Sequence, residues 1–123
     1  MPHPNTLGTQ IKEAFDSSPS FTAHRSGHTE KLLRYQTATG IPFAIRRDVT
    51  SAGRFWAVAD NRFKDAIEAE GFECGFSEPN PKGKSSTGRT SNLDQIPEFK
   101  GKPLHWTTVT TPAEALAAAS KLR

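Results

Sequence analysis

The sequence contains one cysteine, Cys74, and it has no long apolar run. One thiol cannot form a disulfide within the chain, and it cannot supply a cluster of cysteine ligands to a metal. A membrane-spanning helix needs about 20 mostly apolar residues, and no segment approaches that length. Residues 1–10 lack the basic and apolar regions of a secretory signal. We therefore expect a cytoplasmic protein that does not enter a membrane.

The sequence also lacks a convincing catalytic arrangement. Glu68 and Glu70 lie near the end of an expected helix at a spacing that makes their carboxylates diverge, whereas hydrolysis by paired carboxylates needs them to converge. Cys74 stands between two phenylalanines, which is typical of a small buried hydrophobe. His24 and His28 have the spacing of metal ligands on a helix, but the glycine between them argues against a helix. We assign no catalytic residue, metal site or cofactor, and whether the protein is an enzyme stays open.

The composition is that of one folded domain. The chain has 123 residues, of which 34% are hydrophobic and 24% charged, and it carries nine prolines and nine glycines. A chain of this length buries one core, and the prolines and glycines predict irregular stretches. We expect a flexible N-terminal arm over residues 1–10 and a single domain over 11–123, with a long basic Gly/Ser/Lys loop at 77–92.

Alternating apolar and polar residues predict three consecutive strands. Leu33 and Tyr35 alternate with polar neighbours in the first strand, and Phe43 and Ile45 alternate with their neighbours in the second. The third strand covers 54–59, with Phe55 and Ala57 on one face and Trp56 and Val58 on the other. The connections between these strands are short, which predicts an antiparallel meander.

Two helices have clear end signals. Asp60 is expected to cap a helix that ends at Gly71, a residue suited to the left-handed conformation. Thr111 and Glu114 form a capping box around Pro112, at the start of a last helix that follows a strand over 104–110. A short amphipathic N-terminal helix precedes the strands.

The order of these elements is strand, strand, strand, helix, long loop, strand, helix. It predicts an α+β fold with a mainly antiparallel sheet of about four strands, in which the helices pack on one face and leave the other face open. Trp56 and Trp106 each stand in a strand that leads directly into a capped helix, and we interpret this similarity as coincidence because it is too short for a repeat.

The stretch 79–92 is the most unusual part of the chain. It combines lysines, an arginine, two glycines and five hydroxyl side chains with no acidic residue. Glycine lets backbone N–H groups approach an anion closely, so such a loop suits a phosphate. It is not a nucleotide-binding P-loop, because Glu78 occupies the position of the first glycine. The candidate anion-binding residues of this loop are Lys82, Lys84, Ser86, Arg89, Ser91 and Asn92. The alternative is a solvated surface loop.

The expected strands supply a second set of candidates. Arginines stand in or beside all three strands of the meander, and the candidate residues are Arg34, Arg46, Arg47, Arg54 and Trp56. Cations beside an aromatic ring are how many proteins hold single-stranded nucleic acid. The alternative is that Trp56 packs beneath a helix while the arginines extend to water at the rim of the sheet.

These observations favour three functions in order. The first is a small accessory domain that binds nucleic acid, DNA or RNA, through the basic loop and the Arg/Trp face, which suits the formal net charge of +3. The second is a protein-binding inhibitor or adaptor without catalytic activity. The third is an enzyme acting on a phosphorylated or nucleotide substrate, for which a base or nucleophile is missing. The oligomeric state stays open.

Overall fold

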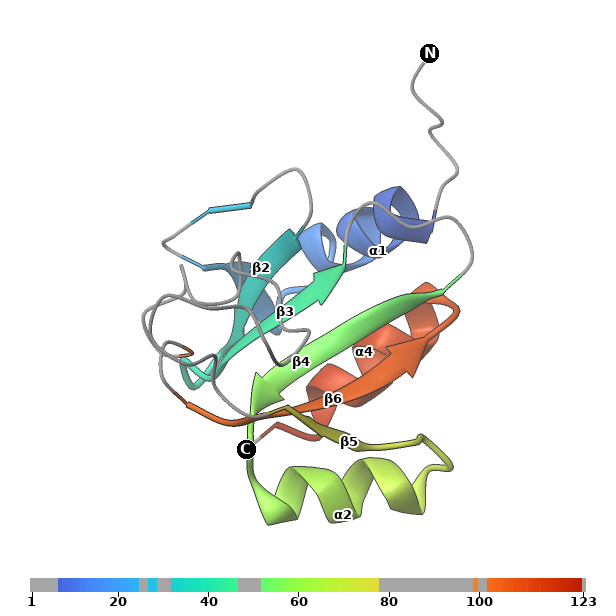
Figure 1. Ribbon diagram of the computed structural model, residues 1–123. Helices are drawn as coiled ribbons and strands as arrows, with labels where there is room; N and C mark the ends of the chain where they lie inside the picture. Colours follow the sequence, from blue (N-terminus) through green and yellow to red (C-terminus); the bar gives the residue numbers. More distant parts are fainter. Residues whose placement is uncertain are drawn as a thin grey trace, which may run out of the picture.

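The computed structural model describes residues 7–24, 27–28, 32–46, 52–77, 99 and 102–122. Within this part of the chain, three helices accompany an antiparallel sheet of six strands in the order β1-β2-β3-β4-β6-β5 (Figure 1). The strands are β1 Phe21–Ala23, β2 Leu32–Thr37, β3 Pro42–Arg46, β4 Gly53–Val58, β5 Gly75–Ser77 and β6 Leu104–Val109. The helices are α1 Leu7–Asp16, α2 Asn61–Ala69 and α4 Pro112–Ser120. The predicted α+β class and antiparallel sheet are confirmed, but the sheet has more strands than the predicted four.

The two additional strands are the edges of the sheet. β1 pairs with β2, and β5 pairs with β6, which lies between β4 and β5. Each edge strand has three residues, too few for an alternating pattern to be recognised in the sequence. Short edge strands also limit pairing with other chains.

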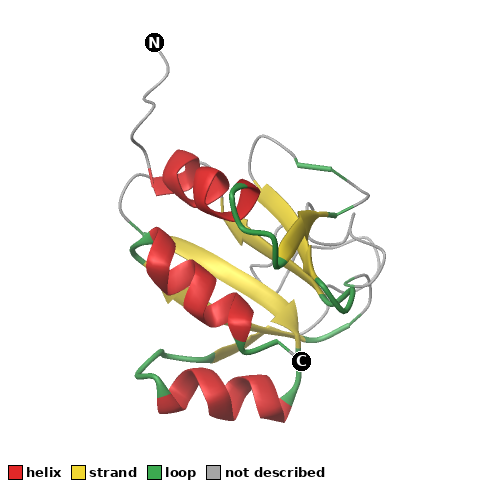
Figure 2. Ribbon diagram, turned by 180° about the vertical axis from the view of Figure 1, so that it is seen from behind, coloured by secondary structure: helices red, strands yellow, loops and turns green. Residues whose placement is uncertain are grey.

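All three helices lie on one side of the sheet. α1 and α4 pack side by side over it, and α2 lies at the β5 end of the same side (Figure 2). The main core forms between them, and its largest fully buried side chains are Tyr35, Phe15, Phe43, Phe55, Phe63, Ile11, Leu33, Ile45 and Ile67. α1 begins at Leu7, inside the range 1–10 for which an irregular arm was expected. No helix in the described part of the chain is long and apolar enough to cross a bilayer.

The predicted start and end of α2 and the predicted start of α4 are confirmed. The Asp60 carboxylate accepts a hydrogen bond from the Arg62 backbone N–H at 2.8 Å, and Gly71 has a φ of +91°. The Thr111 hydroxyl accepts from the Glu114 N–H at 3.1 Å. The Glu114 carboxylate reaches back one residue further than a standard capping box requires, because it accepts from the backbone N–H of Thr110 at 2.6 Å.

The opposite side of the sheet, which we call the outer face, carries a second and smaller core. Leu32, Ala44, Leu104 and Phe99 are fully buried there, together with Trp56. The prediction that this face is open is therefore wrong for much of its area. Leu32 and Ala44 lie on the consecutive strands β2 and β3, whereas Leu104 on β6 is distant from both in sequence, so only the register across the sheet reveals that the three form one apolar patch.

Candidate nucleic-acid interface

The sheet register brings the predicted strand residues to one face. Arg34 is paired with Ala44, Ala44 with Trp56, and Trp56 with Trp106, so their side chains form a row across four strands. Side chains on one face recur at every second residue along a strand. The residues of interest on the outer face are therefore Arg34, Arg46, Arg54, Trp56 and Trp106.

Two of these residues belong to the interior. The side chain of Trp56 is 7% exposed within the smaller core, so its ring offers no stacking surface to a ligand. Arg34 is 3% exposed, and burial lowers the pKa of its guanidinium. Its backbone N–H donates to Nδ1 of His28 at 3.0 Å, and its carbonyl accepts from the N–H of His24 at 2.9 Å. Trp56 and Arg34 are thus both buried, and their predicted contacts with a ligand stay predictions.

The aromatic partner of the arginines is Trp106 on β6. The guanidinium carbon of Arg54 lies 3.8 Å from the centroid of the Trp106 ring, within the range of a cation–π contact. Arg54 is exposed and Trp106 is half-buried. Sequence reasoning chose Trp56 instead, and the signal that could have identified Trp106 was the pair of similar strand-to-helix joints, whose two tryptophans are direct cross-strand partners.

Gly75 makes this arrangement possible. It is the cross-strand partner of Trp106 on β5, and a Cβ atom at this position would collide with Cε2 and Cζ2 of the indole. The indole therefore lies over the β5 backbone where a side chain would otherwise stand. The backbone of Gly75, the indole of Trp106 and the guanidinium of Arg54 form a contiguous group, which we call the Arg54 stack.

The electrostatic setting of the Arg54 stack favours an anion. Among the described residues no carboxylate forms an ion pair with Arg54, so its N–H groups can bind a ligand. Thr108 is its cross-strand partner on β6 and is exposed, which places a hydroxyl on the same surface. Arg46, half-buried at the end of β3, adds a second cation to the outer face.

The remaining predicted candidates are outside the described residues. They are Arg47 and the loop residues Lys82, Lys84, Ser86, Arg89, Ser91 and Asn92. The expected loop at 77–92 begins one residue too early, because Ser77 is the last residue of β5.

His105 and Cys74 are two titratable residues whose pKa values are shifted by burial. His105 is 6% exposed and its Nδ1 accepts from the Asp60 N–H at 3.0 Å, while burial lowers the pKa of its imidazole. Cys74 is half-buried, and burial raises the pKa of its thiol, which keeps it protonated and poorly nucleophilic. No group of three His, Cys, Asp or Glu side chains that could hold a metal occurs among the residues that the structure describes.

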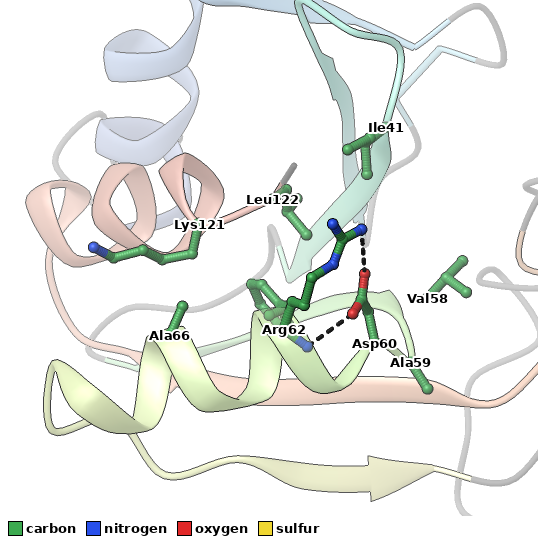
Figure 3. Close-up of a pocket in the computed structure, with 9 residues that line it drawn as sticks. Ile41, Val58, Ala59, Asp60, Arg62, Ala66, Lys121 and Leu122 are labelled. Carbon is green, nitrogen blue, oxygen red and sulfur yellow. Dashed lines mark hydrogen bonds and ion pairs between the residues drawn. The ribbon is translucent and has the colours of Figure 1, made fainter.

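A pocket of about 410 Å³ lies between the start of α2, the end of α4 and Ile41 (Figure 3). Its wall is apolar at Ile41 and Leu122, and its charged residues are Asp60, Arg62 and Lys121. Arg62 lies 3.7 Å from the Asp60 carboxylate, and Lys121 pairs with Glu70 at 2.8 Å. Both cations are thus already compensated by carboxylates, so this pocket is less suited to an anion than the Arg54 stack.

The Arg54 stack has the chemistry expected of a candidate anion-binding surface. It offers a fixed planar cation, a neighbouring hydroxyl and a second arginine on one face of the sheet. Planar guanidinium groups match the geometry of phosphate oxygens and stack on flat ring systems. No family model, curated protein or solved structure matches this chain.

Proposed function

We propose that this chain is a small accessory domain that binds nucleic acid, DNA or RNA, through phosphate contacts of Arg54 and Arg46 on the outer face. The observation that carries the proposal is the exposed guanidinium of Arg54, held over Trp106 and not paired with any described carboxylate. A guanidinium that is already oriented loses less entropy when it binds a phosphate. We place the protein in the cytoplasm, where the Cys74 thiol stays reduced.

Arginines that contact phosphate have a measurable signature in salt. Each neutralised phosphate releases counterions, so the affinity falls as the salt concentration rises. The net charge of +3 adds a long-range attraction that any exposed cation would share. A test must therefore separate a local contact of Arg54 from the general effect of losing one positive charge.

The chain offers a matched control for this test. Arg62 on α2 has a side chain that is 79% exposed, and α2 lies on the helix side of the sheet, away from the outer face (Figure 2). Arg54→Ala and Arg62→Ala remove the same charge. We expect Arg54→Ala to weaken binding of a labelled oligonucleotide by about tenfold at low salt and to reduce the salt slope by about one, whereas Arg62→Ala stays within about twofold of the wild type.

Fluorescence anisotropy titrations at two salt concentrations measure these affinities. The proposal fails if single- and double-stranded DNA and RNA all show no binding at micromolar protein and low salt. It also fails if the two alanine variants weaken binding equally, because the effect would then be one of net charge alone.

A second candidate function is a protein-binding inhibitor or adaptor. It is favoured by Phe76, whose side chain is 54% exposed on the edge strand β5, and by the apolar walls of the pocket beside α2. A protein partner that survives nuclease treatment and is lost on Phe76→Ser would support this candidate. A partner that disappears with nuclease treatment would argue against it.

A further inference from the structure

The Arg54 stack is exposed to solvent at Arg54. The indole of Trp106 lies against the backbone of Gly75 and beneath the Arg54 guanidinium. Arg54 is the exposed member of this group. The guanidinium therefore has one face against the ring and an outer face directed toward solvent, where a further planar group can lie.

The position of the stack is fixed by its neighbours. Trp106 is half-buried and has Trp56 as its cross-strand partner on β4 and Gly75 on β5. Trp56 is anchored in the smaller core with Leu104 and Phe99. Because the indole is held in this way, Arg54 rests on a rigid platform, and a ligand that stacks on it meets a surface already in place.

We propose that the ligand of the outer face is single-stranded nucleic acid, and that an unpaired base stacks on the outer face of the Arg54 guanidinium. This inference rests on the function proposed above, because it names the form of nucleic acid that the same site takes. Bases in a single strand expose their planar faces and stack on aromatic rings or guanidinium planes. In a duplex those faces are covered by neighbouring base pairs, so Arg54 could reach phosphates and base edges but could not stack on a base.

The surroundings of Arg54 suit a single strand of nucleic acid that lies across the β-sheet. The exposed hydroxyl of Thr108 is beside Arg54, and Arg46 is two strands away from Thr108 on the same face. These groups can bind the sugar-phosphate backbone while the base covers the guanidinium. Stacking of this kind is tolerant of sequence, because every base has a planar face.

The test compares three ligands of equal length: a single-stranded oligonucleotide, the same strand with abasic sites, and the duplex. The abasic strand keeps the phosphates and lacks the bases. We expect the single strand to bind about tenfold more tightly than either of the others, a difference in the range that stacking of one base supplies. A single strand containing 2-aminopurine should in addition change its fluorescence on binding, because stacking quenches this base.

Arg54→Lys separates stacking from charge. Lysine keeps the positive charge but has no planar group, so the variant should lose about tenfold in affinity for the single strand and stay within about twofold for the abasic strand. Arg62→Lys is the matched control and should leave all three affinities unchanged. Thermal unfolding of each variant shows whether the fold is kept.

The outcomes distinguish this inference from the function on which it rests. If all three ligands bind equally and Arg54→Lys behaves as the wild type while Arg54→Ala is weakened, the domain binds nucleic acid through phosphates and base stacking is excluded. A preference for the duplex also overturns the inference. If none of the ligands binds, the proposed function itself fails.

Discussion

His105 connects the sheet to the start of α2. It stands on β6 opposite Ala57, and its Nδ1 atom accepts the backbone N–H of Asp60, the residue that caps α2. A protonated imidazole carries a hydrogen on Nδ1 and cannot accept this bond. The joint between β4 and α2 therefore needs a neutral His105, and burial lowers its pKa accordingly.

This bond makes stability depend on pH in a defined direction. The folded protein holds the His105 proton less tightly than the unfolded chain, so the stability contributed by the neutral ring is complete above about pH 6.5 and is lost as the pH falls from there through the folded pKa. With a loss of about 1 kcal/mol for one hydrogen bond, we expect the Tm to fall by roughly 4 °C between pH 7.5 and pH 5. Thermal unfolding followed by circular dichroism measures this shift.

The control is His105→Gln, because the oxygen of the glutamine side chain can accept a hydrogen bond and the glutamine side chain does not titrate. His28 also accepts a backbone N–H through Nδ1, so the relevant quantity is the difference between the wild type and the variant. Asp16, Glu70 and Glu114 have carboxyl pKa values that are lowered, by hydrogen bonds to Lys12, Lys121 and Thr110 respectively, so they titrate below this window. An equal decline in the variant would show that His105 is not responsible.

At the scale of elements, β5 and β6 depend on each other through Gly75 and Trp106. β5 has three residues and no further strand on its outer side within the described chain, so few interactions hold it. The indole of Trp106 lies over its backbone at Gly75. We infer that this contact holds the edge strand β5 in the sheet. It also fixes the position of the Trp106 indole on which the Arg54 guanidinium lies.

A double-mutant cycle tests this dependence. Gly75→Ala introduces a methyl group into the space of the indole and should destabilise the domain by about 1–3 kcal/mol, as overpacking does. In a Trp106→Ala background the same change should cost less than about 0.5 kcal/mol, because the ring that it meets is gone. Chemical denaturation gives the four free energies of unfolding. An identical cost of Gly75→Ala in both backgrounds would mean that the two residues are not coupled.

The elements also show which features a sequence carries. Asp60, Gly71 and Thr111 were assigned correctly because caps and left-handed glycines are local, and each depends on residues within one helical turn. β1 and β5 were not predicted because such short strands are defined mainly by the neighbouring strands with which they pair, and not by a pattern in their own residues. A strand of three residues has no periodicity of its own.

At the scale of the whole molecule, the sheet is covered from both sides to different extents. The helices cover one face (Figure 2). The smaller core around Phe99 and Trp56 covers part of the other face. The fold class could be predicted from element order, because helices that follow strands must bury their apolar stripes. The cover of the outer face could not, since Phe99 clusters with residues of β2, β3 and β4 that are more than 40 residues away along the chain.

The site was also predicted only in part, because contacts between residues that are distant in sequence cannot be recognised from a local pattern. Arg54 and Arg46 were expected on one face because alternation within a strand determines the face toward which each side chain points. The register of the strands agrees with this expectation. The contact of Arg54 with Trp106 was not predicted, because neighbours across a sheet depend on strand order, and β6 lies beside β4 only after the crossover through α2 and β5. Period-two alternation cannot reveal such neighbours.

We propose that this protein binds its ligand on the outer face, at Arg54 and Trp106. The most direct measurement is a two-dimensional ¹H–¹⁵N NMR titration with a short single-stranded oligonucleotide. We predict progressive shifts of the Trp106 indole N–H and the Arg54 Nε–H, while the Arg62 Nε–H on α2 remains in place. Shifts that cluster instead around Arg62, Lys121 and Leu122, with the Trp106 indole unchanged, would contradict the account.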